Sequence, residues 1–463
     1  MKTKQLLIAL SLAFAFTAHA TTYYVRSTGG ADRNNGLTSG TAFLTLTKVF
    51  SGTPVLANGD VIDISGIFTY AVSKTITSSI TIQGTDKTRA VINGISVDDN
   101  SNKNCLNFGS QSATTGLPTS TPTIIIENVT FQNFDNIYAT AVTYNGGTSG
   151  VLNVYPGTTL TCRNVNFLNN QSYTGGAINA SGGALTLEDC YFKNNSAKIS
   201  PMFSPATYYA DGGAINIAVT TNMVGGATPI INTNSISVVI NRCLFEANNA
   251  VRYGSAVRFQ DNSTGATNSL LIQNSTFTGN STTSTLGAKH GATIYIEGNA
   301  ANADIKLINN TIAYNSSIVN LPGANVGVTS TFIADKVTLI NNILFSNYNS
   351  ETTPNSISIK STNLLKESRN NITDQDSSLF DFTAKTTTGK ASGNENSVTS
   401  GQLLLATSLA DNGGATKTLA VTAGSTAINA GYATGVPTVD QRNIQRKGTD
   451  VGAYENATTQ TVK

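Results

Sequence analysis

The chain has 463 residues, of which 28 are lysine or arginine and 26 are aspartate or glutamate, so charged residues make up only 12%. This balance argues against nucleic acid or an anionic lipid surface as the main partner, because both demand a basic protein surface. Glycine is abundant with 41 residues and tryptophan is absent, a composition that disfavours long helices and favours many short strands and turns.

The first 20 residues are predicted to be a signal peptide. Lys2 and Lys4 give it a basic start, Leu6 to Phe16 form an apolar run, and Ala18-His19-Ala20 fits a small-x-small cleavage site. The apolar run is too short to span a bilayer, and no later segment reaches about 18 uninterrupted apolar residues, so no transmembrane segment is expected in the mature chain. That chain would begin at Thr21, and without the two lysines its formal charges cancel.

Residues 21–120 are expected to form an N-terminal cap and the first coils of a β-helix. The relevant residues are Tyr23-Tyr24-Val25, Asn34-Asn35-Gly36, Gly59-Asp60-Val61 and Ile80-Thr81-Ile82-Gln83-Gly84. This stretch looks like the opening of many secreted β-helix proteins, some of which are polysaccharide lyases, and the likeness implies a fold rather than an activity. Farther on, Asp98 and Asp99 share a polar loop, where their carboxylates could bind calcium. No other cofactor is expected.

One pattern recurs seven times between residues 121 and 350. Each copy has an apolar anchor, namely Phe131, Phe167, Phe192, Phe245, Phe277, Ile312 and Leu344. Five residues before the anchor stand Ile126, Cys162, Leu187, Ile240, Ile272, Leu307 and Leu339. Seven residues before it stand Ile124, Leu160, Leu185, Val238, Leu270, Ile305 and Val337. The spacing of two predicts strands with one buried face.

Asparagine marks two further columns of the repeat. Three residues before the anchor stand Asn128, Asn164, Asp189, Arg242, Asn274, Asn309 and Asn341. Asparagine tolerates a left-handed backbone, so this column predicts a tight corner between two strands. Three residues after the anchor stand Asn170, Asn195, Asn248, Asn280, Asn315 and Asn347, with Phe134 in the first copy. Stacked asparagines can bond one another, which predicts an internal ladder.

A third short strand is predicted before six of the copies. It covers residues 152–154, 178–180, 215–217, 257–259, 294–296 and 326–328. One three-stranded coil with loops of variable length explains all the anchor spacings, and stacked coils share a core that one coil cannot form alone. We therefore predict an all-β fold, a right-handed parallel β-helix, in which the phenylalanine column stacks inside the rod and both ends are capped.

Two copies combine Gly-Gly-Ala-Ile with a following Phe-x-x-Asn. They are Gly175 to Ile178 with Phe192 to Asn195, and Gly212 to Ile215 with Phe245 to Asn248. The pair resembles the repeats of chlamydial-type polymorphic outer-membrane proteins over roughly residues 124–347. The resemblance implies a pectin-lyase-like β-helix, often an adhesin, at the surface or outer membrane of a Gram-negative-type bacterium. Those proteins continue into an autotransporter barrel, which is not expected before Lys463.

The last part of the chain is expected to hold irregular late coils or an insertion at 351–400, and coils with a cap at 401–456. The relevant motifs are Asp411-Asn412-Gly413-Gly414, Gly424-Ser425, Ala427-Ile428, Ala430-Gly431, Asp440-Gln441-Arg442 and Asp450-Val451-Gly452-Ala453-Tyr454-Glu455. They resemble the choice-of-anchor Q domain of secreted bacterial proteins. We interpret Asp440, Arg442, Asp450 and Glu455 as an ion-pair network in the cap rather than a catalytic group.

The outward row of the third strand is the candidate binding site. Its residues are Asn153, Asn179, Asn216, Arg258, Tyr295 and Gly327, and the nearby charges are Arg252, Asp261, Lys289, His290 and Glu297. Arg258 and Tyr295 could bind a sugar by a charged hydrogen bond and ring stacking, beside Asn179 and Asn216, although an ordinary solvated face fits as well. Arg258, Lys289 and His290 are the candidate bases of a lyase, whereas the clustered aspartates that a hydrolase needs are missing from this row.

Cys190 and Cys243 occupy the same repeat position, two residues before the anchor, in neighbouring coils. Stacked strands place such residues about 4.8 Å apart, within the reach of a disulfide in an oxidising compartment. In-register parallel neighbours are a poor geometry for that bond, which favours two buried thiols. Cys105 and Cys162 have no clear partner. No CxxC pair occurs and the mature chain has one histidine, so a zinc or iron–sulfur site is not expected.

We predict a monomeric, secreted or surface-exposed, non-catalytic β-helix protein that mediates adhesion or binds a polysaccharide or host-cell glycan. Two alternatives remain: a polysaccharide lyase or glycoside hydrolase that acts along the groove of the β-helix, and a structural envelope protein. An outer groove that holds Arg258 with acidic groups within about 6 Å would favour the enzyme. A flat row of asparagine and threonine would favour binding.

Overall fold

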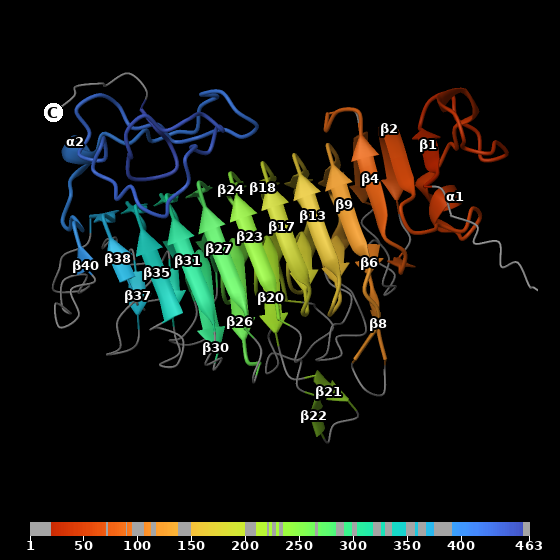
Figure 1. Cartoon of the computed structure of the whole chain (residues 1–463), viewed down its shortest axis with the longest axis horizontal. Helices are drawn as coiled ribbons and strands as arrows, with labels where there is room; N and C mark the ends of the chain where they lie inside the picture. Colours follow the sequence, from red (N-terminus) through yellow and green to blue (C-terminus); the bar gives the residue numbers. More distant parts are fainter. Residues whose placement is uncertain are drawn as a thin grey trace, which may run out of the picture.

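In a computed structural model the chain forms a right-handed parallel β-helix, as predicted, and its coils stack into a rod (Figure 1). The structure describes residues 20–70, 73–88, 90–94, 106–112, 117–137, 150–199, 210–219, 222–224, 228–230, 235–263, 267–283, 291–298, 303–317, 326–328, 336–348, 357–359, 367–374 and 391–456. The signal peptide up to residue 19, Asp98, Asp99, Cys105, Lys289 and His290 lie outside these ranges.

Two long parallel sheets meet at the predicted corner, and β2 contributes to both. Sheet A holds β1 (Thr22–Arg26), β2 (Val61–Tyr70), β4 (Ile80–Gly84), β9 (Thr123–Glu127), β13 (Thr159–Arg163), β17 (Ala184–Glu188), β23 (Ser237–Asn241), β27 (Ser269–Gln273), β31 (Asp304–Ile308), β35 (Val337–Ile340), β38 (Glu367–Arg369) and β40 (Ala391–Ser392). Sheet B holds β5 (Ala90–Gly94), β10 (Thr130–Gln132), β14 (Asn166–Leu168), β18 (Tyr191–Lys193), β24 (Leu244–Glu246), β28 (Thr276–Thr278), β32 (Thr311–Ala313), β36 (Ile343–Phe345) and β39 (Ile372–Thr373).

The remaining parallel strands form sheet C and a short sheet. Sheet C holds β3 (Lys74–Ile76), β6 (Leu106–Phe108), β12 (Leu152–Val154), β16 (Ile178–Ala180), β20 (Ile215–Val219), β26 (Val257–Asp261), β30 (Ile294–Gly298), β34 (Val326–Val328) and β37 (Ile357–Ile359). The short sheet holds β11 (Asp135–Asn136), β15 (Gln171–Ser172), β19 (Ser196–Ala197), β25 (Asn249–Ala250), β29 (Ser281–Thr282) and β33 (Ser316–Ser317). Two antiparallel pairs complete the strands, β7 (Ser110–Gln111) with β8 (Pro118–Ser120), and β21 (Asn222–Val224) with β22 (Thr228–Ile230).

The phenylalanine column stacks inside the rod. Each anchor pairs with the anchor of the next coil, from Phe131 with Phe167 through to Ile312 with Leu344. From Phe167 onward the ring centroids of successive phenylalanines are 4.8, 4.7 and 4.6 Å apart. The phenylalanine rings are buried, and each contributes on the order of 1.5–3 kcal/mol through the area it removes from water.

The predicted corner column has a left-handed backbone, with φ between 49° and 58° in all seven copies. Its side chains bond along the outside of the rod, where Asn164 Nδ2 donates to Asn128 Oδ1 at 2.7 Å. Arg242 and Asp189 replace such an amide pair with two charged hydrogen bonds of 2.8 Å. The internal ladder is formed by the second column, Asn170, Asn195, Asn248, Asn280, Asn315 and Asn347, whose neighbours bond at 2.9–3.0 Å.

A further column changes character along the rod. Two residues before the anchor, the early coils place Val129, Val165, Cys190 and Cys243, and the later coils place Ser275, Asn310, Asn342, Asn371 and Asn394. The later asparagines form a second ladder, which was not predicted from the sequence. Cys162, Cys190 and Cys243 are buried free thiols, so the disulfide considered for Cys190 and Cys243 is not formed in the structure.

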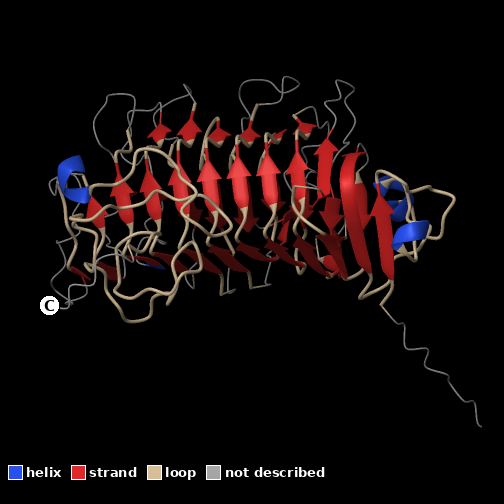
Figure 2. Cartoon of the chain, turned by 90° about the horizontal axis from the view of Figure 1, so that it is seen from above, coloured by secondary structure: helices blue, strands red, loops and turns tan. Residues whose placement is uncertain are grey.

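The two ends of the chain are built differently. After the turn η1 (Ser39–Thr41), helix α1 (Leu46–Phe50) starts at Thr45, whose side chain accepts from Lys48 N, and packs Leu46, Val49 and Phe50 into the core. At the other end, helix α2 (Ser400–Leu403) begins the segment 400–456, which we call the C-terminal strap. We expected coils and a cap there. The strap instead has isolated antiparallel bridges and lies lengthwise over the later coils (Figures 1 and 2).

Apolar contacts hold the strap against the outer face of sheet B. Leu403, Leu419, Val421 and Val451 pack in one cluster with Phe345 and other residues of β32, β36 and β39. The strap has no repeat because it winds no coil, so the column pattern could not predict its path. Within the described residues, no helix is long and apolar enough to cross a membrane.

Candidate functional site

The predicted outward row lies on neighbouring strands of sheet C. Asn153, Asn179, Asn216, Arg258 and Tyr295 pair in register from β12 to β30. Their exposed fractions are only 4–8%, so the row is not the solvated face that we considered. From Arg258 back to Asn153, each side chain donates to the amide oxygen of the residue one coil earlier. The distances are 3.2 Å from Arg258 to Asn216, 2.8 Å from Asn216 to Asn179, 3.4 Å from Asn179 to Asn153 and 3.0 Å from Asn153 to Asn107.

Arg258 is held by two carboxylates. Its Nη1 lies 3.2 Å from Asp211 Oδ2, and its Nε donates to Glu297 Oε1 at 3.0 Å. Arg252 donates to the same Asp211 at 2.7 Å. Burial alone would lower the pKa of Arg258, but the charges of Asp211 and Glu297 outweigh it and raise the pKa. Two positive and two negative groups therefore cancel within one buried cluster.

Two tyrosines complete this cluster. The rings of Tyr253 and Tyr295 stack with centroids 4.2 Å apart, and the guanidinium carbon of Arg252 lies 4.5 Å from the centre of the Tyr253 ring. Burial raises the pKa of the Tyr253 phenol. The Tyr295 ring thus packs on another aromatic ring in its own protein. We refer to Asp211, Arg252, Tyr253, Arg258, Tyr295 and Glu297 as the sheet C site.

Four of the six residues of this site were located from the sequence. The outward row of the third strand contained Arg258 and Tyr295, next to Asn179 and Asn216. Arg252 and Glu297 were predicted to be charges near this row. Asp211 and Tyr253 were missed, although each stands five residues before a row residue and directly before a glycine with positive φ. Those turns stack, since Gly212 N donates to Tyr253 O at 2.8 Å. The common offset of five residues was the available signal.

The chemistry of the sheet C site favours binding over proton transfer. A guanidinium remains protonated and cannot act as a base at neutral pH. Asp211 and Glu297 are both paired with arginine, so the site holds no carboxylate without a cationic partner. In the part of the chain that the structure describes, no three histidine, cysteine, aspartate or glutamate residues are grouped so as to hold a metal ion.

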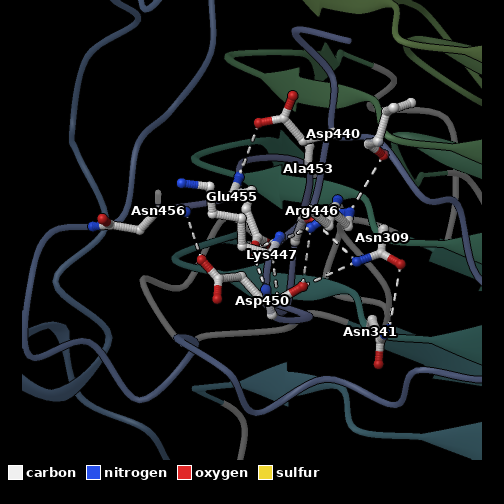
Figure 3. Close-up of polar contacts among 12 residues, drawn as sticks. Asn309, Asn341, Asp440, Arg446, Lys447, Asp450, Ala453, Glu455 and Asn456 are labelled. Atoms are coloured by element: carbon white, nitrogen blue, oxygen red, sulfur yellow. Dashed lines mark hydrogen bonds and ion pairs between the residues drawn. The ribbon is translucent and has the colours of Figure 1, made fainter. Parts of the chain in front are cut away.

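The strap contains a second buried charge cluster, shown in Figure 3. Arg446 pairs with Glu455 at 3.1 Å and also donates to Asn274 Oδ1 at the corner of sheets A and B. Arg442 pairs with Asp440 at 2.6 Å. These contacts agree with the ion-pair interpretation. They lie along the side of the rod rather than at its end, so they fasten the strap to the coils beneath it.

Among the residues that the structure describes, Asp450 is the buried carboxylate of this cluster whose oxygens form no ion pair with an arginine. It is 1% exposed, and its two oxygens accept from Asn429 N at 2.8 Å and Asn456 N at 2.6 Å. Burial raises the pKa of Asp450 to about 6. The carboxyl group therefore changes charge close to neutral pH, which makes it a source of pH dependence in the strap.

No protein-family model matches the sequence, and a search of curated proteins gives no match. Among solved structures, pectate lyase Pel9A is 13% identical with a TM-score of 0.45, over 94% of this chain and 96% of that one. A rhamnogalacturonan lyase is 14% identical with a TM-score of 0.35, over 76% and 87%. Pectin methylesterase PemA from Erwinia chrysanthemi is 11% identical with a TM-score of 0.29, over 83% and 95%. Identities and TM-scores as low as these support no conclusion about the activity of this chain. The resemblances to outer-membrane repeats and to the choice-of-anchor Q domain stay predictions.

Proposed function

We propose that this chain is a secreted or surface-exposed β-helix protein that binds glycan at the sheet C site without cleaving it. The observation that carries the proposal is the charge-neutral cluster of paired guanidinium and carboxylate groups beside two stacked tyrosines. Ion pairing fixes the orientation of these donors and acceptors, which sugar hydroxyls can then meet at little entropic cost. The Arg252 and Glu297 side chains remain 16% and 20% exposed and form the accessible edge of the site.

The test is a binding and turnover assay on the purified mature chain with a panel of neutral and uronate-containing polysaccharides. Retardation in affinity electrophoresis measures binding, and new unsaturated or reducing ends measure cleavage. We expect binding to at least one glycan without cleavage, and at least a tenfold loss of affinity in Arg252→Ala.

Arg163→Ala is the matched control, because Arg163 on sheet A also bridges two carboxylates, Glu127 and Glu188, at 2.9 and 3.2 Å. This variant removes an equivalent surface ion pair on another face and should bind as the parent does. Equal losses in both variants, or no binding to any polysaccharide in the panel, would contradict the proposal.

A polysaccharide lyase is the second candidate, and one observation favours it. Arg258 has two carboxylates within about 3 Å, the arrangement that we took from the sequence as favouring an enzyme, although both charges raise the Arg258 pKa and oppose its use as a base. The same incubation decides between the two functions. Reproducible formation of unsaturated ends that disappears in Arg258→Ala would establish the lyase and overturn the non-catalytic proposal.

Export is part of the same proposal and rests on the leader-like residues 1–20. Expression of the full chain in a Gram-negative host, followed by fractionation and by protease treatment of intact cells, tests it. We expect the shortened chain outside the cytoplasm. Full-length chain retained in the cytoplasm would contradict this part.

A further inference from the structure

A buried carboxylate near the start of the fold accepts hydrogen bonds from backbone nitrogens. Asp60 is 2% exposed and directly precedes β2. Its Oδ2 accepts from Ala57 N at 2.8 Å and its Oδ1 accepts from the backbone nitrogen of Thr21 at 2.9 Å. Among the residues the structure describes, no lysine, arginine or histidine pairs with it.

The backbone nitrogen that faces Asp60 belongs to the residue after the predicted cleavage site. Ala18-His19-Ala20 supplies the small residues that a leader peptidase requires, and Thr21 follows. Thr21 is already held in place, because Val61 N donates to its carbonyl at 2.9 Å as β1 and β2 pair in parallel. An amine released at this position would therefore point at Asp60 without any rearrangement.

We propose that Thr21 is the mature N-terminus and that its α-ammonium group forms an ion pair with Asp60, which locks β1 onto the first coil. Leader peptidase hydrolysis breaks the bond between the Ala20 carbonyl carbon and the Thr21 nitrogen. Water supplies the hydroxyl to the new Ala20 carboxyl group and a proton to the amine, which takes a second proton from solvent. The inference rests on the export half of the proposed function and is independent of glycan binding.

The ion pair has a defined pH response. A free α-amino group has an ordinary pKa near 8, and a carboxylate partner raises it. The contribution to stability is thus complete below about pH 8 and is lost as the pH rises through the raised pKa. The Tyr23 phenol lies within the electrostatic influence of Asp60. Burial together with the Asp60 charge raises the pKa of this phenol, so Tyr23 stays neutral while the α-amino group titrates.

Two measurements test the proposal. Intact mass and N-terminal sequencing of the exported chain should give a start at Thr21. Hydrogen exchange of the β1 amides should then be compared between chains of defined start, one beginning at Thr21 and one retaining Ala20, in which the Thr21 nitrogen is an uncharged amide. We expect exchange to be about tenfold faster in the longer chain, because the hydrogen bond from Thr21 N to Asp60 then lacks the positive charge on its donor.

Asp60→Asn keeps the side-chain acceptor but removes its charge, so the two chains should then exchange alike. Asp32→Asn is the matched control, because Asp32 lies in the same region and bonds Leu44 N and Thr45 N at 2.9 and 3.0 Å, away from Thr21. It should leave the tenfold difference intact. A start at another residue, or equal exchange of the two chains with Asp60 present, would overturn the proposal, whatever the outcome of the glycan assays.

Discussion

At the scale of single residues, the interior of the rod depends on side-chain amides that find all their partners in neighbouring coils. Asn248 is fully buried, and its Nδ2 donates to Asn280 Oδ1 at 2.9 Å and to Phe192 O at 3.0 Å. Its Oδ1 accepts from the backbone and side chain of Asn195 at 3.0 Å. A buried amide is stabilising here because no water could replace these bonds.

Asn248→Ala should therefore be severely destabilising. It removes four buried hydrogen bonds, to Asn195, Asn280 and Phe192. We expect a loss of about 3–5 kcal/mol in the free energy of unfolding, measured by urea denaturation. Asn194→Gly is the control, since Asn194 is the exposed left-handed residue of the neighbouring corner and glycine keeps its backbone conformation. Asn194→Gly should lower the free energy of unfolding by less than about 1 kcal/mol. A similar loss in both variants would contradict this account.

Asp450 should make the strap pH dependent. Its folded pKa of about 6 lies above the ordinary value, so the folded protein binds the proton more tightly than the unfolded chain does. The corresponding stability is complete below about pH 4 and is lost as the pH rises through 6, a change of up to about 3 kcal/mol. The protection factors of residues 427–456, in which the ordinary pH dependence of amide exchange is divided out, should thus fall between pH 5 and pH 8. The Asp450→Asn variant should lack this change, and an unaltered pH profile would contradict the assignment.

At the scale of elements, the corner between sheets A and B accepts either two amides or an ion pair. Asn164 and Asn128 use one hydrogen bond of 2.7 Å, whereas Arg242 and Asp189 use two of 2.8 Å at the next corner positions. All four residues have a positive φ, which asparagine adopts with less strain than arginine. The ion pair is therefore a local substitute for the amide pair.

A double-mutant cycle tests this equivalence. Asp189→Asn and Arg242→Asn should each destabilise by about 1 kcal/mol, because each leaves one charge of a partly buried pair without its partner. The double variant restores an amide pair and should lie within about 0.5 kcal/mol of the parent in urea denaturation. If the losses of unfolding free energy in the two single variants add up in the double variant, an asparagine pair cannot replace this ion pair.

The elements that could be predicted are those that repeat. The anchors, the corners and the third strands were located because each coil places the same residue type at the same offset, and stacking converts that offset into register. Asp211 and Tyr253 were missed because their turns precede the strands and have no apolar signature. The strap was missed because hydrogen bonds such as that from the Thr276 hydroxyl to Gln441 Oε1 join residues 165 positions apart, and no periodicity relates them.

At the scale of the whole molecule, the strap is a second layer over part of the rod. Besides its apolar cluster, the strap forms hydrogen bonds with successive coils. Gln441 donates to Cys243 O at 3.3 Å, and the strap carbonyls of Asp450 and Ala430 accept from Asn309 at 3.0 Å and from Asn370 at 2.7 Å. The coils from β23 to β39 are thus connected by the strap as well as by their own strands.

Removal of residues 404–456 should loosen only the coils beneath the strap. The outer face of β32 and β36 would lose its cover, and we expect faster hydrogen exchange in β31 to β39 together with binding of a hydrophobic dye. Strands β9 to β18 should exchange as before, because coils of a solenoid depend mainly on their nearest neighbours. A uniform increase along the whole rod would show that the strap stabilises the molecule as one unit.

The continuous amide ladder has a consequence for chain length. From Asn170 to Asn347 each coil offers a donor to one neighbour and an acceptor to the other, so removing one whole turn of this part of the solenoid lets the flanking amides join with the same chemistry. The coils of this ladder that precede β23 can in this way be added or removed without leaving a ladder amide unpaired. Under the strap this freedom ends, because a segment of fixed length is tied to successive turns and would no longer reach its attachment points.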